Sequence, residues 1–185
     1  PCPSELGYVA EGVTTYMGDL FLLEAGIVDL TGWCALMTKL LERHLNNPGR
    51  LNMSVAASSF DTWLDGYRLG VRGRKGSIYV EGAVLAFLCD TRIMSSTDGQ
   101  ASLSTAMRLL WERYGQPRIG LTADMYWDVL AEVAGERLDD LRRDHAEGTK
   151  DTWDPLVQAM ATQGLVLTKH LDGEGITRVV LAPAD

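Results

Sequence analysis

Residues 77–95 constrain the fold more than any other segment of this chain. The stretch is long enough for about five turns of helix. Apolar side chains occupy nearly its whole circumference: Ile78, Tyr79, Val80, Ala83, Val84, Leu85, Phe87, Leu88 and Cys89. A helix that is apolar on every side must be covered on every side by other elements. The sequence therefore predicts a helical bundle with residues 77–95 at its centre.

Amphipathic segments precede and follow this central helix, and the tail has a different character. Helical spacing of apolar side chains predicts further helices over 4–25, 31–46, 55–67, 102–114, 123–134, 138–146 and 154–163. Residues 165–170 and 176–181 are instead rich in β-forming side chains and flank a glycine-rich turn, which favours a hairpin. We therefore expect a mainly α protein, with a helical domain over 1–164. The hairpin at 165–185 is either its tail or the start of a following module.

Charge and cysteine content argue against several classes of function. A net charge of −8 lacks the basic surface that nucleic acid or an anionic membrane attracts, so we expect neither as a partner. No apolar run is long enough to span a bilayer, which predicts a soluble protein, cytoplasmic or periplasmic. Cys2, Cys34 and Cys89 form no C-x-x-C pair, so no disulfide framework or thiolate zinc site is expected. We expect Cys34 and Cys89 to be small buried hydrophobes.

Histidine is the usual protein ligand of catalytic zinc, and this chain has three, His44, His145 and His170. No two of them lie three or four residues apart, the spacing that places two ligands on one face of a helix. We therefore expect each to be a surface or helix-end residue, and no convincing zinc site within this chain alone. Motifs for a serine or cysteine nucleophile are also absent from the sequence.

One carboxylate lies in an unusual setting near the start of the chain. Glu11 stands beside Gly12 in an apolar helical stretch that runs from Tyr8 to Tyr16. A carboxylate buried in such a stretch needs a metal ion, an arginine or backbone amides to compensate its charge. The residues alone leave these three alternatives open.

Several segments together resemble the glycyl aminopeptidase family of zinc metallopeptidases, in the gluzincin clan. Glu11-Gly12 is similar to the family's helix for the third zinc ligand, and Tyr79-Val80-Glu81-Gly82 is similar to its Tyr-x-Lys-Gly element. Further matches follow in the family's order over 58–63, 67–68, 85–92 and 102–115. The resemblance extends over roughly residues 5 to 167, which the order and spacing of these segments support.

The resemblance implies that this chain is the C-terminal, helical part of a gluzincin catalytic domain. Glu11 would be the third zinc ligand, and the Tyr79 hydroxyl would stabilise the oxyanion of the tetrahedral intermediate. The His-Glu-x-x-His helix, with the other two ligands and the general base, is absent from the sequence. We therefore expect a fragment of an aminopeptidase that removes N-terminal glycine or alanine from peptides. Alone, it should be inactive and hold no tightly bound zinc; its partner would be the missing N-terminal half of the domain.

Two departures from the family pattern support an alternative. Thr15 stands where the family often has an acidic residue, and Glu81 replaces the lysine of Tyr-x-Lys-Gly, which reverses a charge near the presumed substrate side. For Tyr79, the alternative is a buried aromatic residue whose hydroxyl bonds to the backbone. For the whole chain, it is a non-catalytic helical interaction module or a degenerate peptidase.

Overall fold

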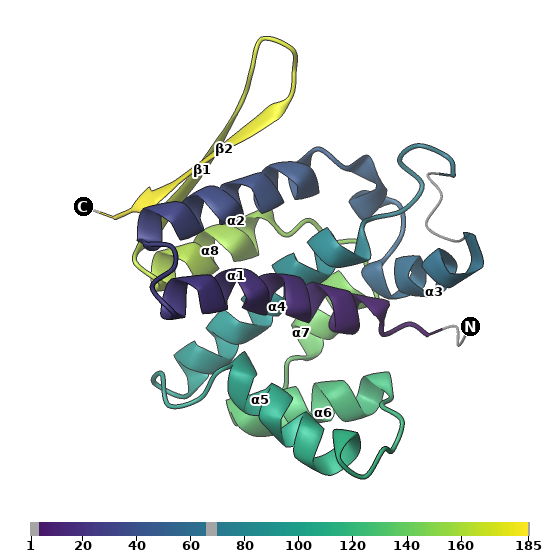
Figure 1. Cartoon of the computed structure of the whole chain (residues 1–185). Helices are drawn as coiled ribbons and strands as arrows, with labels where there is room; N and C mark the ends of the chain where they lie inside the picture. The colour runs from purple at the N-terminus through teal and green to yellow at the C-terminus, as the bar shows by residue number, and fades with distance from the viewer. Residues whose placement is uncertain (1–3, 66–69, 185) are drawn as a thin grey trace.

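The computed structural model describes residues 4–65 and 70–184 and confirms a mainly α fold with a C-terminal β-hairpin (Figure 1). The α-helices are α1 (Thr14–Glu24), α2 (Leu30–Leu45), α3 (Val55–Asp65), α4 (Ile78–Ser96), α5 (Leu103–Leu110), α6 (Ala123–Ala134), α7 (Asp139–Leu141) and α8 (Trp153–Thr162). Other helical turns are η1 (Tyr8–Val13), η2 (Pro48–Leu51), η3 (Trp111–Gly115) and η4 (Arg142–Ala146). The strands are β1 (Leu165–Leu171) and β2 (Thr177–Pro183). In the part of the chain that the structure describes, no helix has the length and apolar character needed to cross a membrane.

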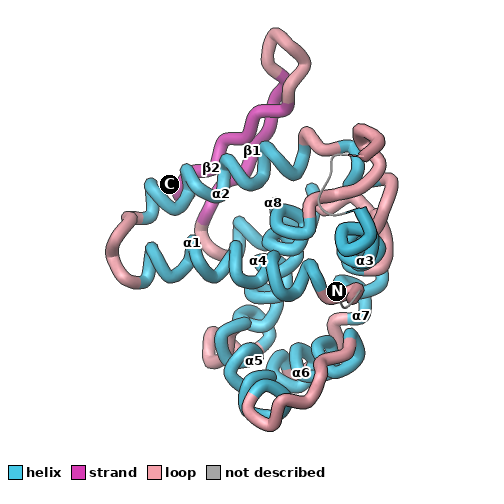
Figure 2. The backbone as a smooth tube through the Cα atoms, turned by 45° about the vertical axis from the view of Figure 1, so that its right-hand side comes forward, coloured by secondary structure: helices cyan, strands magenta, loops and turns pink. Residues whose placement is uncertain are grey.

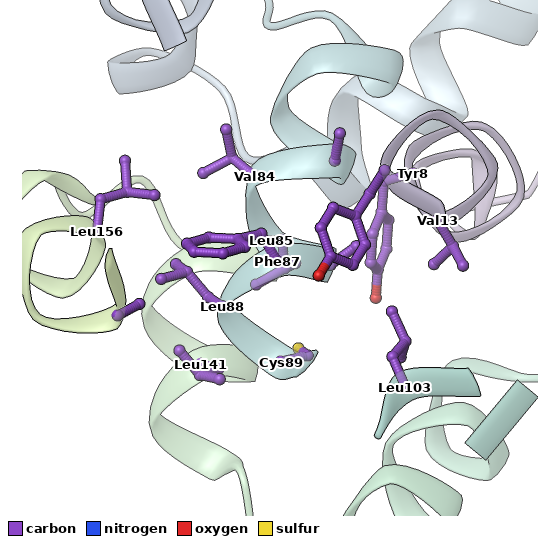
Figure 3. Packing of buried hydrophobic residues seen from close by; sticks show 14 of the residues in the cluster. Tyr8, Val13, Val84, Leu85, Phe87, Leu88, Cys89, Leu103, Leu141 and Leu156 are labelled. Carbon is purple, nitrogen blue, oxygen red and sulfur yellow. The ribbon is translucent and has the colours of Figure 1, made fainter. Parts of the chain in front are cut away.

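Helix α4 lies at the centre of the bundle, as its composition predicts (Figure 2). From Ile78 to Thr91 every residue of α4 except Tyr79 is buried. Figure 3 shows its side chains reaching Leu156 of α8 on one side, Tyr8 and Val13 of η1 on the other, and Leu103 of α5 below. The central helix therefore lies in the middle of the core, and most of the helices around it contact it.

Helix α4 and the π-helical turn η1 cross at a pair of glycines. A β-carbon on Gly12 would lie 2.3 Å from the backbone of Gly82, and one on Gly82 would lie 2.4 Å from the carbonyl oxygen of Tyr8. No side chain larger than hydrogen fits between two backbones that approach so closely. The glycine in each Glu-Gly pair thus has a packing role, and the crossing fixes how Glu11 and Glu81 are presented.

Asp90 is a buried carboxylate that joins three elements. Its Oδ2 accepts a hydrogen bond from the Tyr16 hydroxyl at 2.5 Å, and its Oδ1 accepts one from the Leu103 backbone N–H at 2.7 Å. The second bond satisfies one of the free N–H groups at the start of α5, where a negative charge is favoured. Burial and the nearby Asp90 raise the pKa of Tyr16 far above its ordinary value, which keeps this phenol a donor.

We expect Asp90→Ala to lower the free energy of unfolding by about 3 kcal/mol, because it leaves two buried donors without an acceptor. Asp128→Ala is the matched control, since Asp128 is an exposed aspartate on α6; its effect should stay within about 0.5 kcal/mol. Urea unfolding of both variants measures the difference. Equal effects would show that Asp90 does not hold these elements together.

The C-terminal hairpin lies along the bundle with one face buried. β1 and β2 pair antiparallel from Leu165↔Pro183 to Leu171↔Thr177, with β2 against α2 and β1 against α8. Side chains on the inner face are buried: Leu165, Leu167, Val179 and Leu181. The Asn46 side chain donates to the Thr177 carbonyl at 2.8 Å and accepts from the Thr177 N–H at 2.9 Å. Figure 1 shows the tip of the hairpin extending beyond the helices.

Candidate functional site

Glu11 lies on η1, a π-helical turn, and its side chain is partly buried rather than fully buried as the sequence led us to expect. Turns of this kind occur often at functional sites, because the extra residue redirects the side chains around it. Thr15 donates its hydroxyl to the backbone carbonyl of Glu11 at 2.6 Å, and so does not engage the carboxylate. Among the residues that the structure describes, the Glu11 carboxylate has no hydrogen-bond or ion-pair partner. It is thus available as a ligand.

Whether these residues could hold a zinc ion depends on how their potential ligand side chains are grouped. Within the described ranges, no three His, Cys, Asp or Glu side chains are grouped so that they could hold a metal ion. A catalytic zinc site needs three protein ligands. Among these residues, Glu11 therefore has no two further ligands grouped with it.

Tyr79 lies in the first turn of α4, which begins after the N-cap residue Ser77. It is 37 % exposed, so the alternative is wrong as to burial, while the bond from its hydroxyl to the backbone stays a prediction. The ring lines a groove of about 680 Å³ between the turn at 46–48 and the loop at 70–77. Pockets that bind small ligands typically have volumes in this range. Tyr79 thus lines a space large enough for a small ligand.

The glycine crossing brings the two expected site segments together. Tyr79 lies one turn before Gly82 on the same face of α4, and Glu11 is adjacent to Gly12, which contacts Gly82. Ile78 also approaches the start of η1, since a β-carbon on Gly7 would lie 3.2 Å from its Cδ1. The segment of Glu11 and the first turn of α4 therefore pack directly against each other.

Glu81 is buried inside the protein, whereas the resemblance led us to expect its charge near the presumed substrate side. Its carboxylate is buried and hydrogen-bonds Nδ1 of His44, while Nε2 of His44 lies 2.6 Å from the Thr152 hydroxyl. The exposed fractions of the three residues are 9 %, 2 % and 8 %. We call Glu81, His44 and Thr152 the histidine cluster. It ties α2 and the start of α4 to the residue that precedes α8.

The expectation that His44 is a surface or helix-end residue is wrong as to its exposure. The sequence held a signal for this, because His44 continues the apolar face of α2 at helical spacing from Met37, Leu40 and Leu41. His170 is exposed on β1, as expected, and His145 is partly buried at the end of η4.

A hydroxyl, an imidazole and a carboxylate in series are also the parts of a nucleophilic triad. The surroundings of the histidine cluster exclude that role. Thr152 is 8 % exposed, and the cavity beside the cluster has a volume of about 30 Å³, enough for about one water molecule. An acyl substrate cannot reach the hydroxyl, so the cluster holds elements together.

Burial lowers the pKa of His145, partly opposed by the hydrogen bond with the Lys150 carbonyl at 3.1 Å and by nearby Asp144 and Asp140. The folded chain thus prefers the neutral imidazole. A lowered folded pKa gives stability that is present above the unfolded value, about 6.5, and lost as the pH falls through the folded pKa.

We therefore expect the midpoint of urea unfolding to fall as the pH is lowered from about 7 to about 5.5. This dependence should weaken in His145→Gln, which cannot take up the proton. His170→Gln is the control, because His170 is exposed, and it should keep the dependence. The same pH profile in wild type and His145→Gln would contradict the assignment.

Comparison with known proteins supports the relationship that the motifs indicate. The profile of the M61 glycyl aminopeptidase family matches residues 1–85, a range that contains both Glu11 and Tyr79. An aminopeptidase N family protein from Idiomarina loihiensis is similar in structure, with a TM-score of 0.83 and 24% sequence identity. The match covers 94% of this chain and 30% of that protein, so the chain spans less than a third of its length. No curated protein matches the chain.

The fold is therefore that of a helical region found in an aminopeptidase-family protein. More particularly, residues 1–85 match the M61 glycyl aminopeptidases, and this range contains the Glu-Gly and Tyr-x-Glu-Gly segments that carry the resemblance.

Proposed function

We propose that this chain is the helical part of a zinc-dependent aminopeptidase that removes glycine or alanine from the N-terminus of peptides. Glu11 supplies one zinc ligand, and the Tyr79 phenol stabilises the oxyanion that forms on the scissile carbonyl. The observation that carries the proposal is the glycine crossing, which packs these two family-matched segments together. The groove beside Tyr79 gives room for the peptide.

The remaining zinc ligands and the general base lie outside these 185 residues in this proposal. The sequence contains no His-Glu-x-x-His, and Glu11 belongs to no three-ligand group among the described residues. What the chain contributes is one carboxylate and one phenol on rigid helical supports. Alone it should neither bind zinc tightly nor hydrolyse peptides.

The partner in this proposal is the N-terminal half of the catalytic domain. Phe60, Trp63 and Leu64 follow one another at helical spacing on α3 and are 42 %, 41 % and 66 % exposed. An apolar helix face of this kind is typical of an interaction surface. The start of η1 lies beside α3, where the Tyr8 N–H donates to Ser59 Oγ at 2.9 Å (Figure 1). We therefore assign α3 to the interface with that half.

We also propose that the hairpin at 165–185 is the tail of the helical domain over 1–164 and packs as part of it. The inner face of the hairpin is part of the helical core, which supports this proposal. So do the two hydrogen bonds between the Asn46 side chain and the Thr177 backbone. A following module would begin after the hairpin.

Both departures from the family pattern have local structural explanations. Thr15 bonds the Glu11 carbonyl within η1–α1, and Glu81 is held by His44 inside the protein. Neither residue faces the groove beside Tyr79. They therefore give no support to a degenerate peptidase.

The test is made in the complete protein that contains these residues, with glycine and alanine anilides as substrates and zinc content measured in parallel. Glu11→Gln should lose both zinc and activity, because a neutral amide is a poor zinc ligand. Tyr79→Phe should keep its zinc and lose about 10²- to 10³-fold in kcat. Glu5→Gln, at an exposed glutamate six residues before Glu11, is the control and should change neither. Full zinc content and activity in Glu11→Gln would overturn the proposal.

A further inference from the structure

A small cavity lies beside the histidine cluster, between the end of α2, the turn η2, the start of α4 and the loop before α8. Its volume is about 30 Å³. Arg50 and Glu81 both line it, and their side chains are 10% and 9% exposed. A space of this size accommodates about one water molecule when polar groups line it.

Two buried polar atoms on these residues lack a partner among the described residues. One is Nε of Arg50, a donor, and the other is Oε1 of Glu81, an acceptor. The other ends of both side chains are engaged, since Arg50 Nη1 pairs with Asp151 Oδ1 at 3.2 Å and Glu81 Oε2 bonds Nδ1 of His44. Leaving a buried donor or acceptor unsatisfied is costly, so nearly all such atoms in proteins have a hydrogen-bond partner.

A water molecule placed between the two atoms would satisfy both, because its oxygen accepts and its hydrogens donate. A third partner lines the same cavity. His145 has its Nδ1 at 3.1 Å from the Lys150 carbonyl, so Nδ1 carries the proton and Nε2 keeps a lone pair. Ordered waters in protein interiors typically make about three hydrogen bonds.

We infer that this cavity binds a single structural water, which accepts a hydrogen bond from Arg50 Nε and donates one to Glu81 Oε1. A cation is a poor alternative, because the Arg50 guanidinium would lie against it. The water completes a closed ring of polar groups from Asp151 through Arg50, Glu81 and His44 to Thr152, which follows Asp151 in the chain.

The ring has a consequence for the start of α4. With the water in place, both carboxylate oxygens of Glu81 are held, one by His44 and one through the water by Arg50. Glu81 lies two residues after Tyr79, so the first turn of α4 is tethered to η2 and α2.

A crystal structure of the chain with resolved waters tests the inference directly. The expected result is one ordered water about 2.7–3.2 Å from both Arg50 Nε and Glu81 Oε1. A direct Arg50–Glu81 bond, an empty cavity or a metal ion at this position would overturn it.

A solution measurement on the same chain provides a second test. The Arg50 Nε–H should show a cross peak to a long-lived water in rotating-frame NMR spectra. Asp151→Asn is the matched control, because it weakens the ion pair of Arg50 but leaves Nε–H in place, and it should keep the cross peak. Arg50→Met removes the donor, and its crystal structure should show the water displaced or disordered. A water unchanged in Arg50→Met would show that Arg50 does not hold it.

Discussion

Gly12→Ala is expected to lower the free energy of unfolding by about 3 kcal/mol or more. The added β-carbon would lie 2.3 Å from the backbone of Gly82, so the nearest atoms belong to main chain and cannot turn away. Overpacking of a core usually costs about 1–3 kcal/mol when side chains can adjust. Here η1 and α4 themselves must separate, which places the effect at the upper end of that range. Gly82→Ala should behave alike, because its β-carbon would meet the Tyr8 carbonyl oxygen at 2.4 Å.

Gly18→Ala is the matched control for this prediction. Gly18 lies on α1, and a β-carbon there would meet nothing within 4 Å. Because alanine is the better helix former, this variant should be more stable than wild type by up to about 1 kcal/mol. The double variant Gly12→Ala/Gly82→Ala should cost less than the sum of the two singles, since one separation of the helices relieves both clashes. Urea unfolding measures all four variants, and a Gly12→Ala as stable as Gly18→Ala would contradict the crossing.

His44→Leu is expected to cost about 3–5 kcal/mol, because it leaves the Glu81 carboxylate buried without its imidazole partner. Glu81 and His44 are both more than nine-tenths buried, so bulk solvent does not hydrate the carboxylate in place of the imidazole. The Thr152 hydroxyl loses its partner in the same substitution.

The double variant His44→Leu/Glu81→Leu distinguishes the cost of the unpaired carboxylate from the cost of changed packing. Replacing both members of a buried polar pair by apolar residues of similar volume is often close to neutral. We therefore expect the double variant to be more stable than His44→Leu alone. His170→Leu, at an exposed histidine of β1, should have an effect within about 0.5 kcal/mol. If the double variant were the least stable of the three, the carboxylate would not be the source of the loss.

Much of the fold could be predicted from the periodicity of apolar residues in the sequence. The central helix was predicted because residues 77–95 are apolar on all sides, and α4 is indeed buried around nearly its whole surface. The π-helical turns were not foreseen, since one extra residue in a turn scarcely alters the spacing of apolar side chains. The predicted continuation of α3 to residue 67, and the family match at Tyr67-Arg68, lie outside the described residues.

Less of the candidate site could be predicted from the sequence, because its geometry depends on contacts between segments that are distant in the chain. The resemblance identified Glu11 and Tyr79 as candidate site residues. It did not explain why glycines follow Glu11 and Glu81, because the reason is the close approach of two backbones in the folded protein. Burial of His44 could have been read from the apolar face of α2. Its partners could not, since Glu81 and Thr152 lie 37 and 108 residues away in the chain.

Zinc titration into the metal-free chain, followed by calorimetry, tests the central claim most directly. That claim is that these residues carry one ligand of a site whose other ligands lie elsewhere. The account predicts no tight, stoichiometric binding, and the same weak response in wild type and Glu11→Ala. A tight site with one zinc per chain that disappears in Glu11→Ala would contradict it, because the chain would then build a complete zinc site by itself.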